Sequence, residues 1–318
     1  IVTHKNPDGD AMGSSLGLWN FLKKKKHNVF VITPNDYPAF LNWLPGNKNV
    51  VDFEQEKLKA VKLFAKTEII FCLDFNSLKR IEEVGREVAK SSGIKILIDH
   101  HPEPEPGFDF VLHDVKASST AELVFEFICL LGEKKQIDKS VSNCLYTGIM
   151  TDTNNFSIPS TTERTHAITS ELIKYNAQNS VVYEKIYNTY TQSRLRLLGY
   201  SLSDKMKIFP EFSAAYISLS ASELGKFDYR KGDTEGLVNY PLFIEGIKFS
   251  AFFIERDGTI KISFRSKGTF DVNKFARMHF SGGGHRNAAG GQSDTSLDAA
   301  INKFFSLLSS YRDDINKS

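Results

Sequence analysis

Short apolar runs alternate with segments of helical periodicity over the first part of the sequence, and this alternation limits the fold more than any other feature. Runs of β-branched or apolar residues predict strands at residues 29–33, 69–73 and 94–98. Apolar residues at three- and four-residue intervals predict helices at residues 11–26, 78–90, 121–131 and 139–150. Alternation of this kind is typical of a parallel sheet covered by helices. We therefore expect residues 1 to about 187 to form an α/β domain with a parallel sheet flanked by helices.

The pattern changes after residue 187. Residues 180 to about 208 have helical character, and we interpret residues 188–208 as a helical connector. After Pro210 come strand-like runs at residues 213–219, 249–254 and 260–264, a hairpin signal at Asp257-Gly258, a glycine-rich loop and a closing helix. The predicted organisation is a first domain at residues 1–187, the connector at 188–208, and a smaller second domain at 209–318.

Composition limits the class of protein. The chain has 318 residues, 41% of them hydrophobic and 25% charged, as expected of a soluble protein with two domains. Its net charge of +2 argues against binding along long nucleic acid.

Cys72, Cys129 and Cys144 lack metal-binding spacing and predict a reducing, cytoplasmic location. No apolar run is long enough to span a membrane, and the strand-like residues 1–3 lead us to expect that a preceding segment is missing.

The first group of candidate metal ligands lies near the start of the chain. The segment His4-Lys-Asn-Pro-Asp8-Gly-Asp10 leaves a strand-like run, turns, and enters a predicted helix. Such a turn can aim an imidazole and two carboxylates at one point, because glycine between the acids allows close backbone approach. An ordinary turn with Asp10 as helix N-cap explains the same residues. This segment alone therefore leaves both interpretations open.

Further acidic and imidazole side chains follow two predicted strands. Asp74 comes directly after residues 69–73, and Asp99-His100-His101 closes the run at 94–98. Ligands of open parallel sheets bind beyond the carboxyl ends of the strands. Adjacent histidines at such a position favour contact with a metal or substrate over a structural pair. We interpret these segments as parts of one site.

Asp152 follows the predicted helix at residues 139–150, where Thr151-Asp152-Thr153 is also a plausible capping sequence. Oxygen and imidazole donors without thiolates suit a hard or borderline divalent ion. Paired divalent ions are a common device for displacement at phosphorus. Taken together, the segments predict a phosphoesterase with two divalent ions, for which Mn²⁺ is the expected metal and Mg²⁺ the alternative.

A glycine-rich segment, Gly282-Gly-Gly-His285-Arg286-Asn-Ala-Ala-Gly290-Gly291, lies far downstream. Bare backbone amides can surround a phosphate, and His285 with Arg265 would add donors and positive charge. A flexible turn is the alternative. The histidine and small residues among the glycines favour close approach to a ligand.

Six short motifs follow one another along the chain. They are H-K-N-P-D-G-D-A at 4–11, L-D-F-N at 73–76, I-D-H-H-P at 98–102, A-S-S-T-A-E at 117–122, G-I-M-T-D-T at 148–153 and G-G-G-H-R-N-A-A-G-G at 282–291. In this set and order the chain resembles the DHH/DHHA1 phosphoesterases, in particular their nanoRNase and 3'-phosphoadenosine-5'-phosphate phosphatase type. The resemblance implies a DHH metal-binding catalytic domain at residues 1–187 and an α/β DHHA1 substrate-binding domain with a mixed sheet at 209–318.

The resemblance also implies a role for each site residue. One ion would be held by His4, Asp8 and Asp74, and a second by Asp10, Asp74, His100 and Asp152. The predicted catalytic residues are His101, facing the substrate phosphate, and Asp99, orienting an imidazole. The residues that would bind the far end of the nucleotide are Arg265, Ser266, Gly283, Gly284 and His285. Asn154 stands where relatives have glycine, and asparagine tolerates left-handed backbone well enough to expect little effect.

We therefore predict metal-activated hydrolysis of short oligoribonucleotides, 3'-phosphoadenosine-5'-phosphate or linear dinucleotides in a cleft between the domains. Alternative predictions are a family II-like inorganic pyrophosphatase, a single-strand exonuclease, and a nucleotide- or RNA-binding module without activity. The expected partner is short RNA or a small nucleotide, with no path for long DNA and no membrane. A homodimer is also compatible with the sequence.

Overall fold

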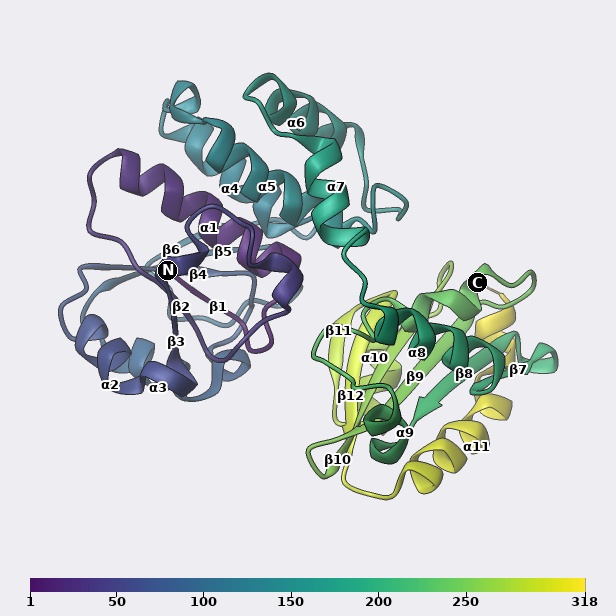
Figure 1. The fold of residues 1–318 in the computed structure, drawn as a ribbon. Helices are drawn as coiled ribbons and strands as arrows, with labels where there is room; N and C mark the ends of the chain where they lie inside the picture. Colours follow the sequence, from purple (N-terminus) through teal and green to yellow (C-terminus); the bar gives the residue numbers. More distant parts are fainter. Residues whose placement is uncertain (318) are drawn as a thin grey trace. The chain divides into compact units, whose positions relative to one another are not determined.

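The computed structural model describes residues 1–317. They form two compact units, Ile1–Thr189 and a second that begins at Tyr190, and each is described by itself (Figure 1). The assignment of residues 1–187, 188–208 and 209–318 to a catalytic domain, a connector and a substrate domain stays a prediction. Within residues 1–317, no helix combines the length and the apolar character that a membrane crossing requires.

The first unit is built on a six-stranded sheet in the order β3-β2-β1-β4-β5-β6. Every neighbouring pair in it is parallel, which confirms the predicted parallel sheet. The strands are β1 (Val2–Thr3), β2 (Val31–Thr33), β3 (Val50–Asp52), β4 (Ile69–Leu73), β5 (Ile94–Asp99) and β6 (Phe110–His113). Because the strands are parallel, the residues that follow β1, β4 and β5 lie at the same edge of the sheet.

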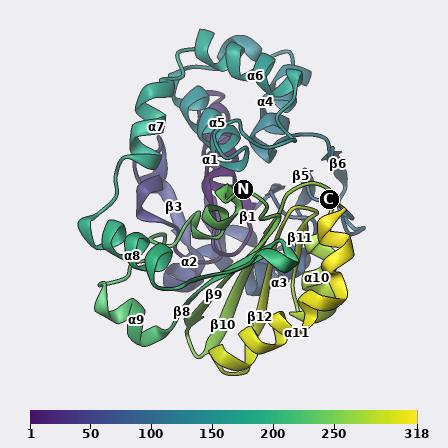
Figure 2. The ribbon, with the colours of Figure 1, turned by 90° about the vertical axis from the view of Figure 1, so that its right-hand side faces the viewer.

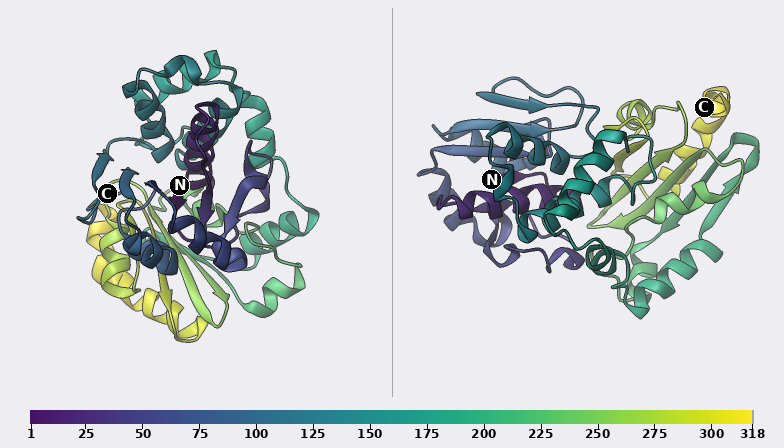
Figure 3. Two further views of the ribbon diagram at one scale, coloured as in Figure 1. Left: turned by 90° about the vertical axis from the view of Figure 1, so that its left-hand side faces the viewer. Right: turned by 90° about the horizontal axis from the view of Figure 1, so that it is seen from above.

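Helices cover both faces of this sheet (Figures 1 and 3). Phe71 and Leu73 of β4 pack in one buried cluster, with α1 (Gly9–Lys24), α4 (Thr120–Leu130), α5 (Lys139–Asp152), α6 (Glu163–Lys174) and α7 (Asn179–Tyr187). Ile70 and Cys72 point the other way, into a cluster with α2 (Phe53–Phe64) and α3 (Glu82–Lys90). Strand side chains alternate between the faces, so a strand buried on both sides must be apolar throughout, as residues 69–73 are.

The helical character expected over residues 180 to about 208 is confirmed only in part, because the segment contains two separate helices and the start of a strand. Helix α7 ends at Tyr187, and α8 (Gln192–Ser203) begins only after Thr191, whose side chain caps it by accepting the amide hydrogen of Arg194. Residues 206–209 form strand β7 (Met206–Phe209). The Thr-Tyr-Thr sequence at residues 189–191 disfavours helix continuation, because β-branched and aromatic residues lose side-chain freedom in a helix.

The second unit also contains a six-stranded sheet, in the order β11-β12-β10-β9-β8-β7. Only β8 and β9 pair in parallel and the other neighbours are antiparallel, which confirms the predicted mixed sheet. Its remaining strands are β8 (Ala214–Leu219), β9 (Phe249–Arg256), β10 (Thr259–Ser266), β11 (Gly283–His285) and β12 (Ala288–Ser293). The predicted hairpin joins β9 to β10, with Asp257 at φ 53° and Gly258 at φ 72° in the tight turn.

Phenylalanines fill one face of this second sheet. Phe249, Phe253 and Phe264 pack there against α10 (Val272–His279) and α11 (Leu297–Asn316). The opposite face packs Phe252 and Ile254 against α8 and α9 (Ala221–Lys226) and the 3₁₀ helix η6 (Leu237–Phe243) (Figure 2). The unit thus has its own core on each side of its sheet.

The glycine-rich segment is a hairpin of β11 and β12 and not the expected loop. A Cβ atom on Gly282 would lie 1.9 Å from the carbonyl oxygen of Gly290. Gly284 has φ of 149°, and a Cβ atom there would lie 2.6 Å from the carbonyl oxygen of Ala288. Glycine is needed here because the backbones approach closely, so the composition reflects packing within a sheet.

Candidate metal centre

The loop after β1 brings His4 and Asp8 together. Asp8 is the N-cap of α1, where its Oδ1 accepts the amide hydrogens of Asp10 and Ala11, both at 3.0 Å. Its second oxygen, Oδ2, lies 3.7 Å from Nε2 of His4. The helix cap is therefore Asp8, not Asp10 as the turn interpretation proposed. A single carboxylate both starts the helix and faces the histidine.

Asp10 lies in the first turn of α1 and is 2% exposed. Its Oδ2 accepts the amide hydrogen of Thr120 at 2.6 Å, and its Oδ1 accepts that of Ala121 at 2.9 Å. These amides belong to the start of α4, where backbone N–H groups lack helical partners and the helix dipole favours a negative charge. The start of α4 thus fixes the orientation of the buried carboxylate.

Asp74 follows β4 and has a left-handed backbone with φ of 66°. Its Oδ1 accepts a hydrogen bond from the hydroxyl of Thr120 at 3.0 Å and lies 3.6 Å from Nε2 of His100. Its Oδ2 lies 3.4 Å from Nε2 of His4. The two oxygens of Asp74 therefore face two different histidines, which is the geometry of a bridging carboxylate.

His100 follows β5 and is 6% exposed. Its Nδ1 donates to the carbonyl oxygen of Ala117 at 3.3 Å, which directs Nε2 toward the carboxylates. From Nε2 the distance is 3.5 Å to Oδ2 of Asp152, 3.6 Å to Oδ1 of Asp74 and 4.0 Å to Oδ2 of Asp10. A backbone acceptor on one ring nitrogen is the usual way in which a protein orients a ligating imidazole.

Asp152 reaches this group because α1 and α5 pack very closely. It is the last residue of α5. A Cβ atom on Gly13 would lie 2.6 Å from the carbonyl oxygen of Cys144, and one on Gly148 would lie 2.7 Å from Oδ1 of Asp10. Only glycine permits this approach of the two helices, and the approach brings the end of α5 to the start of α1.

His101 and Asp99 form a second buried pair at the end of β5. Nδ1 of His101 donates to Oδ1 of Asp99 at 2.8 Å, and the side chain of Asp99 is fully buried. This hydrogen bond fixes the orientation of the His101 ring, and the supporting role of Asp99 in the site stays a prediction. His113 of β6 donates through Nε2 to the carbonyl oxygen of His101 at 2.7 Å. It therefore holds the same turn from the neighbouring strand.

The pKa values show how strongly these groups interact. Burial raises the pKa of Asp10 well above its usual value, and the adjacent carboxylates of Asp74 and Asp152 raise it further. Burial also opposes ionisation of Asp74, but contact with His4 and the charges of the other histidines hold its pKa far below normal. Burial lowers the pKa of His4, yet Asp74 and Asp8 outweigh this and raise it to about 9. The carboxylates of Asp10, Asp74 and Asp152 therefore lie close enough to repel one another, and a bound cation would relieve this repulsion.

The ligand atoms form two adjacent groups with a common member. His4, Asp8 and Asp74 place one donor atom each within 4.8 Å of one another, and Asp10, Asp74 and His100 do the same. Asp152 joins the second group through its contact with His100. Carboxylate and imidazole donors in this arrangement fit divalent cations of the Mn²⁺ or Mg²⁺ type. The structure thus brings together all six side chains that we predicted as ligands, and their ligand role stays a prediction.

The predicted substrate residues of the second unit lie on neighbouring strands. Arg265 of β10 pairs with Ala288 of β12, which in turn pairs with His285 of β11. Directly opposed residues of antiparallel strands share a face, so Arg265 and His285 lie in one row on the face opposite Phe264. Ser266 is buried and donates its hydroxyl to the carbonyl oxygen of Phe270 at 2.7 Å.

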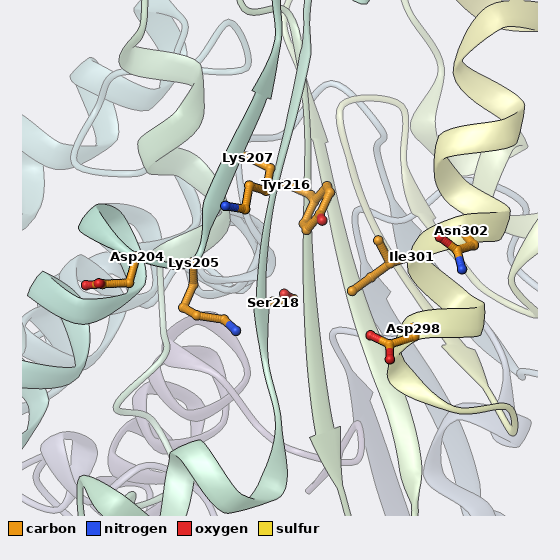
Figure 4. Close-up of a pocket in the computed structure, with 8 residues that line it drawn as sticks. All are labelled: Asp204, Lys205, Lys207, Tyr216, Ser218, Asp298, Ile301 and Asn302. Carbon is orange, nitrogen blue, oxygen red and sulfur yellow. The ribbon is translucent and has the colours of Figure 1, made fainter.

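Gly283 and Gly284 are in β11, where the side chain of Asn273 accepts the amide hydrogen of Gly284 at 3.1 Å. A hollow of about 470 Å³ lies at the other edge of this sheet (Figure 4). Lys207, Tyr216 and Ser218 of β7 and β8 line one side of it, and Asp298 and Asn302 of α11 line the other. None of the predicted substrate residues is among those that line this hollow.

The sequence interpretation did not assign roles to the network that holds the start of α4. Glu122 is fully buried, and its Oε2 accepts hydrogen bonds from the hydroxyls of Ser118 at 2.6 Å and Thr165 at 3.1 Å. Arg164 lies with Nε 2.9 Å from Oε1 of Glu122 and also pairs with Asp114 and Glu126. The Ser119-Thr-Ala-Glu122 sequence has the form of a helix-start motif and could have located this helix end.

Comparison with known proteins places this geometry in a family. The model of the DHH family, N-terminal domain, matches residues 1–149, and that of the DHHA1 domain matches residues 212–311. The chain is 32% identical to a bifunctional oligoribonuclease and PAP phosphatase of Bacillus subtilis, over 91% of this chain and 88% of the relative. It is 30% identical to a probable enzyme of the same description from Streptococcus mutans, over 92% of this chain and 88% of the relative.

A solved structure is also similar to this chain, in both sequence and fold. The crystal structure of an exopolyphosphatase-related protein from Bacteroides fragilis is 46% identical to this chain and superimposes with a TM-score of 0.95. The match covers 99% of this chain and 93% of the other. Both family models and relatives that match over most of their length lead to the same conclusion: this chain belongs to the DHH/DHHA1 family.

Proposed function

We propose that this protein is a divalent-metal-dependent phosphoesterase that hydrolyses short oligoribonucleotides and 3'-phosphoadenosine-5'-phosphate, with linear dinucleotides as further substrates. The observation that carries the proposal is the pair of ligand groups joined by Asp74. Relatives named oligoribonuclease and PAP phosphatase support the substrate class. The expected metal is Mn²⁺, with Mg²⁺ as the alternative.

The proposed ligands divide between the two groups. His4, Asp8 and Asp74 would hold one ion, and Asp10, Asp74, His100 and Asp152 would hold the other. Ions bound there would neutralise charge on phosphoryl oxygens and lower the pKa of a water molecule. The chain itself provides rigidity, because helix-start amides or Thr120 fix the carboxylates of Asp8, Asp10 and Asp74 before any substrate binds.

His101 is the proposed contact for the reacting phosphate. Burial and the charge of Arg80 lower its pKa against the opposing effects of Asp99 and Asp74. The lowered pKa favours the neutral ring, with its proton on Nδ1, where Asp99 accepts it. Nε2 would then accept the proton that the attacking water gives up and return it to the leaving oxygen of the ester. Asp99 fixes this tautomer and, in our proposal, does not itself touch substrate.

The second unit would supply contacts to the rest of the nucleotide. We propose that Arg265 and His285, which lie in one row of the sheet, bind through their charge and ring nitrogens. Gly283 and Gly284 would offer backbone groups. Ser266 would act through the turn that it stabilises, since its hydroxyl already donates to Phe270.

The test is a comparison of substrates with the full chain. The purified protein is incubated with Mn²⁺ and, in parallel, with a labelled triribonucleotide, 3'-phosphoadenosine-5'-phosphate, a linear diribonucleotide, pyrophosphate, inorganic polyphosphate and long single-stranded DNA. We expect turnover of the first three, and none after chelation of the metal. A preference for pyrophosphate, polyphosphate or long DNA would contradict the substrate assignment. Absence of any metal-dependent turnover would contradict the enzymatic proposal as a whole.

A further inference from the structure

The short 3₁₀ helix η3 (Leu78–Ile81) holds its backbone beside the loop that carries His4. Lys5 donates its amide hydrogen to the carbonyl oxygen of Arg80 at 3.1 Å. On the other side, Glu105 accepts the amide hydrogen of Leu78 at 2.5 Å. Two segments distant in the sequence therefore fix the position of Arg80, although it belongs to a connection between a strand and a helix.

The backbone around η3 is constrained further by conformation and packing. Asp74 before it and Glu82 at its end have φ of 66° and 47°, a left-handed region that non-glycine residues enter at a cost of about 1–3 kcal/mol each. Ile81 is fully buried, and a Cβ atom on Gly85 of α3 would lie 2.2 Å from the carbonyl oxygen of Leu78. Such strained conformations persist where the surroundings determine them, and they are concentrated at functional sites.

The side chain of Arg80 is exposed, in contrast to its fixed backbone. The nearby Lys5 is neutralised by Glu82 at 2.7 Å. In the described part of the chain no carboxylate forms an ion pair with Arg80 within 4.0 Å. The contacts that fix Arg80 thus involve its backbone and that of its neighbours, and no ion pair in the described part of the chain holds its guanidinium.

Arg80 lies beside the loop that carries the proposed ligand His4. Its carbonyl oxygen accepts the amide hydrogen of Lys5, the residue that follows His4, at 3.1 Å. Arg80 is thus an exposed cation next to this loop, and no carboxylate among residues 1–317 forms an ion pair with it. A planar guanidinium offers paired N–H donors that match two oxygens of a phosphate.

We propose that Arg80 is a substrate-contacting residue that binds the reacting phosphate from the side of η3. This inference rests on the proposed phosphoesterase function. It adds to that function a residue which the sequence motifs did not indicate. Arg80 would donate to non-bridging phosphate oxygens and stabilise the charge that gathers on them during hydrolysis.

The test compares two substitutions of Arg80 with one of its neighbour. Arg80→Gln removes the charge, and Arg80→Lys keeps the charge without the paired donors. Lys79→Gln removes a charge that is also exposed, one residue away. With Mn²⁺ and the linear diribonucleotide, we expect Arg80→Gln to lower kcat/KM by about 10- to 100-fold, the effect of one charge-assisted contact. Arg80→Lys should recover part of this loss, and Lys79→Gln should stay within about twofold of the wild type.

Two further measurements separate substrate contact from other effects. The Mn²⁺ affinity and the Tm of Arg80→Gln should equal those of the wild type, because Arg80 is neither a ligand nor a buried group. A loss of activity explained by weaker metal binding, or a value of kcat/KM within twofold of the wild type, would overturn the inference. If the wild type hydrolyses none of the substrates, the proposed function fails. The contact between Arg80 and a phosphate is then tested by measuring nucleotide binding. Tenfold weaker binding of the 5'-phosphorylated diribonucleotide to Arg80→Gln would then support the contact, and equal binding would refute it.

Discussion

Arg164→Met should destabilise the first unit more than any loss of a surface ion pair. Arg164 is the cation beside the fully buried Glu122, at 2.9 Å from Nε to Oε1, and its Nε hydrogen is donated to Glu126. Removing one partner of a buried ion pair costs about 3–5 kcal/mol, because the remaining charge is left uncompensated. Methionine keeps much of the side-chain volume, so the change is chiefly one of charge.

The expected cost of losing Arg164 is below the upper end of this range, because hydrogen bonds and hydration still stabilise the remaining carboxylates. Oε2 of Glu122 still accepts hydrogen bonds from the hydroxyls of Ser118 and Thr165, at 2.6 and 3.1 Å, after Arg164 is removed. Arg164 itself is partly exposed, and its other partners, Asp114 and Glu126, can be hydrated. We therefore expect a loss of about 2–4 kcal/mol in the free energy of unfolding.

Urea denaturation of the metal-free protein measures this loss. Lys174→Met is the control, because its partner Glu171 belongs to an exposed pair whose loss should cost less than about 1 kcal/mol. Adding Glu122→Gln to Arg164→Met removes the uncompensated charge, so the double variant should be more stable than the sum of the two single losses predicts. Strict additivity, or a change within about 0.5 kcal/mol for Arg164→Met, would refute the assigned role of this network.

Three further predictions concern the centre and the hairpin. His100→Gln should lower kcat by about 100-fold or more with an unchanged circular dichroism spectrum, because it removes a proposed ligand and leaves the fold intact. Asp74 keeps His4 protonated up to a pKa of about 9, against 6.5 in the unfolded chain. The metal-free protein should therefore have this stabilisation in full below pH 6.5. Its free energy of unfolding should fall by up to about 3 kcal/mol as the pH rises to 9. In urea denaturation, His4→Gln should abolish this dependence on pH. Gly282→Ala should lower the Tm by several degrees, since its Cβ atom would lie 1.9 Å from a carbonyl oxygen of β12, whereas Gly225→Ala in α9, with open space around it, should not.

Sequence reasoning succeeds where local pattern and topology act together. Residues 69–73 are apolar throughout because β4 is buried on both faces, and an uninterrupted apolar run of this length is itself an indication of a parallel sheet. Parallel strands end at one edge, so Asp74 and His100 could be expected to meet. The apolar pattern of the strands and their parallel direction are therefore enough to predict that these two residues lie close together.

Long-range contacts are beyond the reach of the sequence. The hydrogen bonds from the start of α4 to Asp10 join residues about 110 positions apart, and nothing local to Thr120 specifies them. Helical periodicity continues on both sides of the break between α7 and α8, so periodicity alone does not reveal that break. The glycine-rich hairpin differs from the expected loop because glycine suits flexible segments and closely packed strands alike.

The sequence leaves open whether the acidic residues have a structural role or a ligand role. In the structure the two roles are compatible, because one side chain can serve both. Asp8 uses Oδ1 to cap α1 and turns Oδ2 to His4. In the same way, His100 uses Nδ1 to hold the carbonyl oxygen of Ala117 and turns Nε2 to the carboxylates. Each side chain has two polar atoms, and anchoring one of them limits the directions in which the other can point. Ordinary capping chemistry is therefore what pre-organises the centre, because an anchored carboxylate loses little further conformational freedom when it binds a cation.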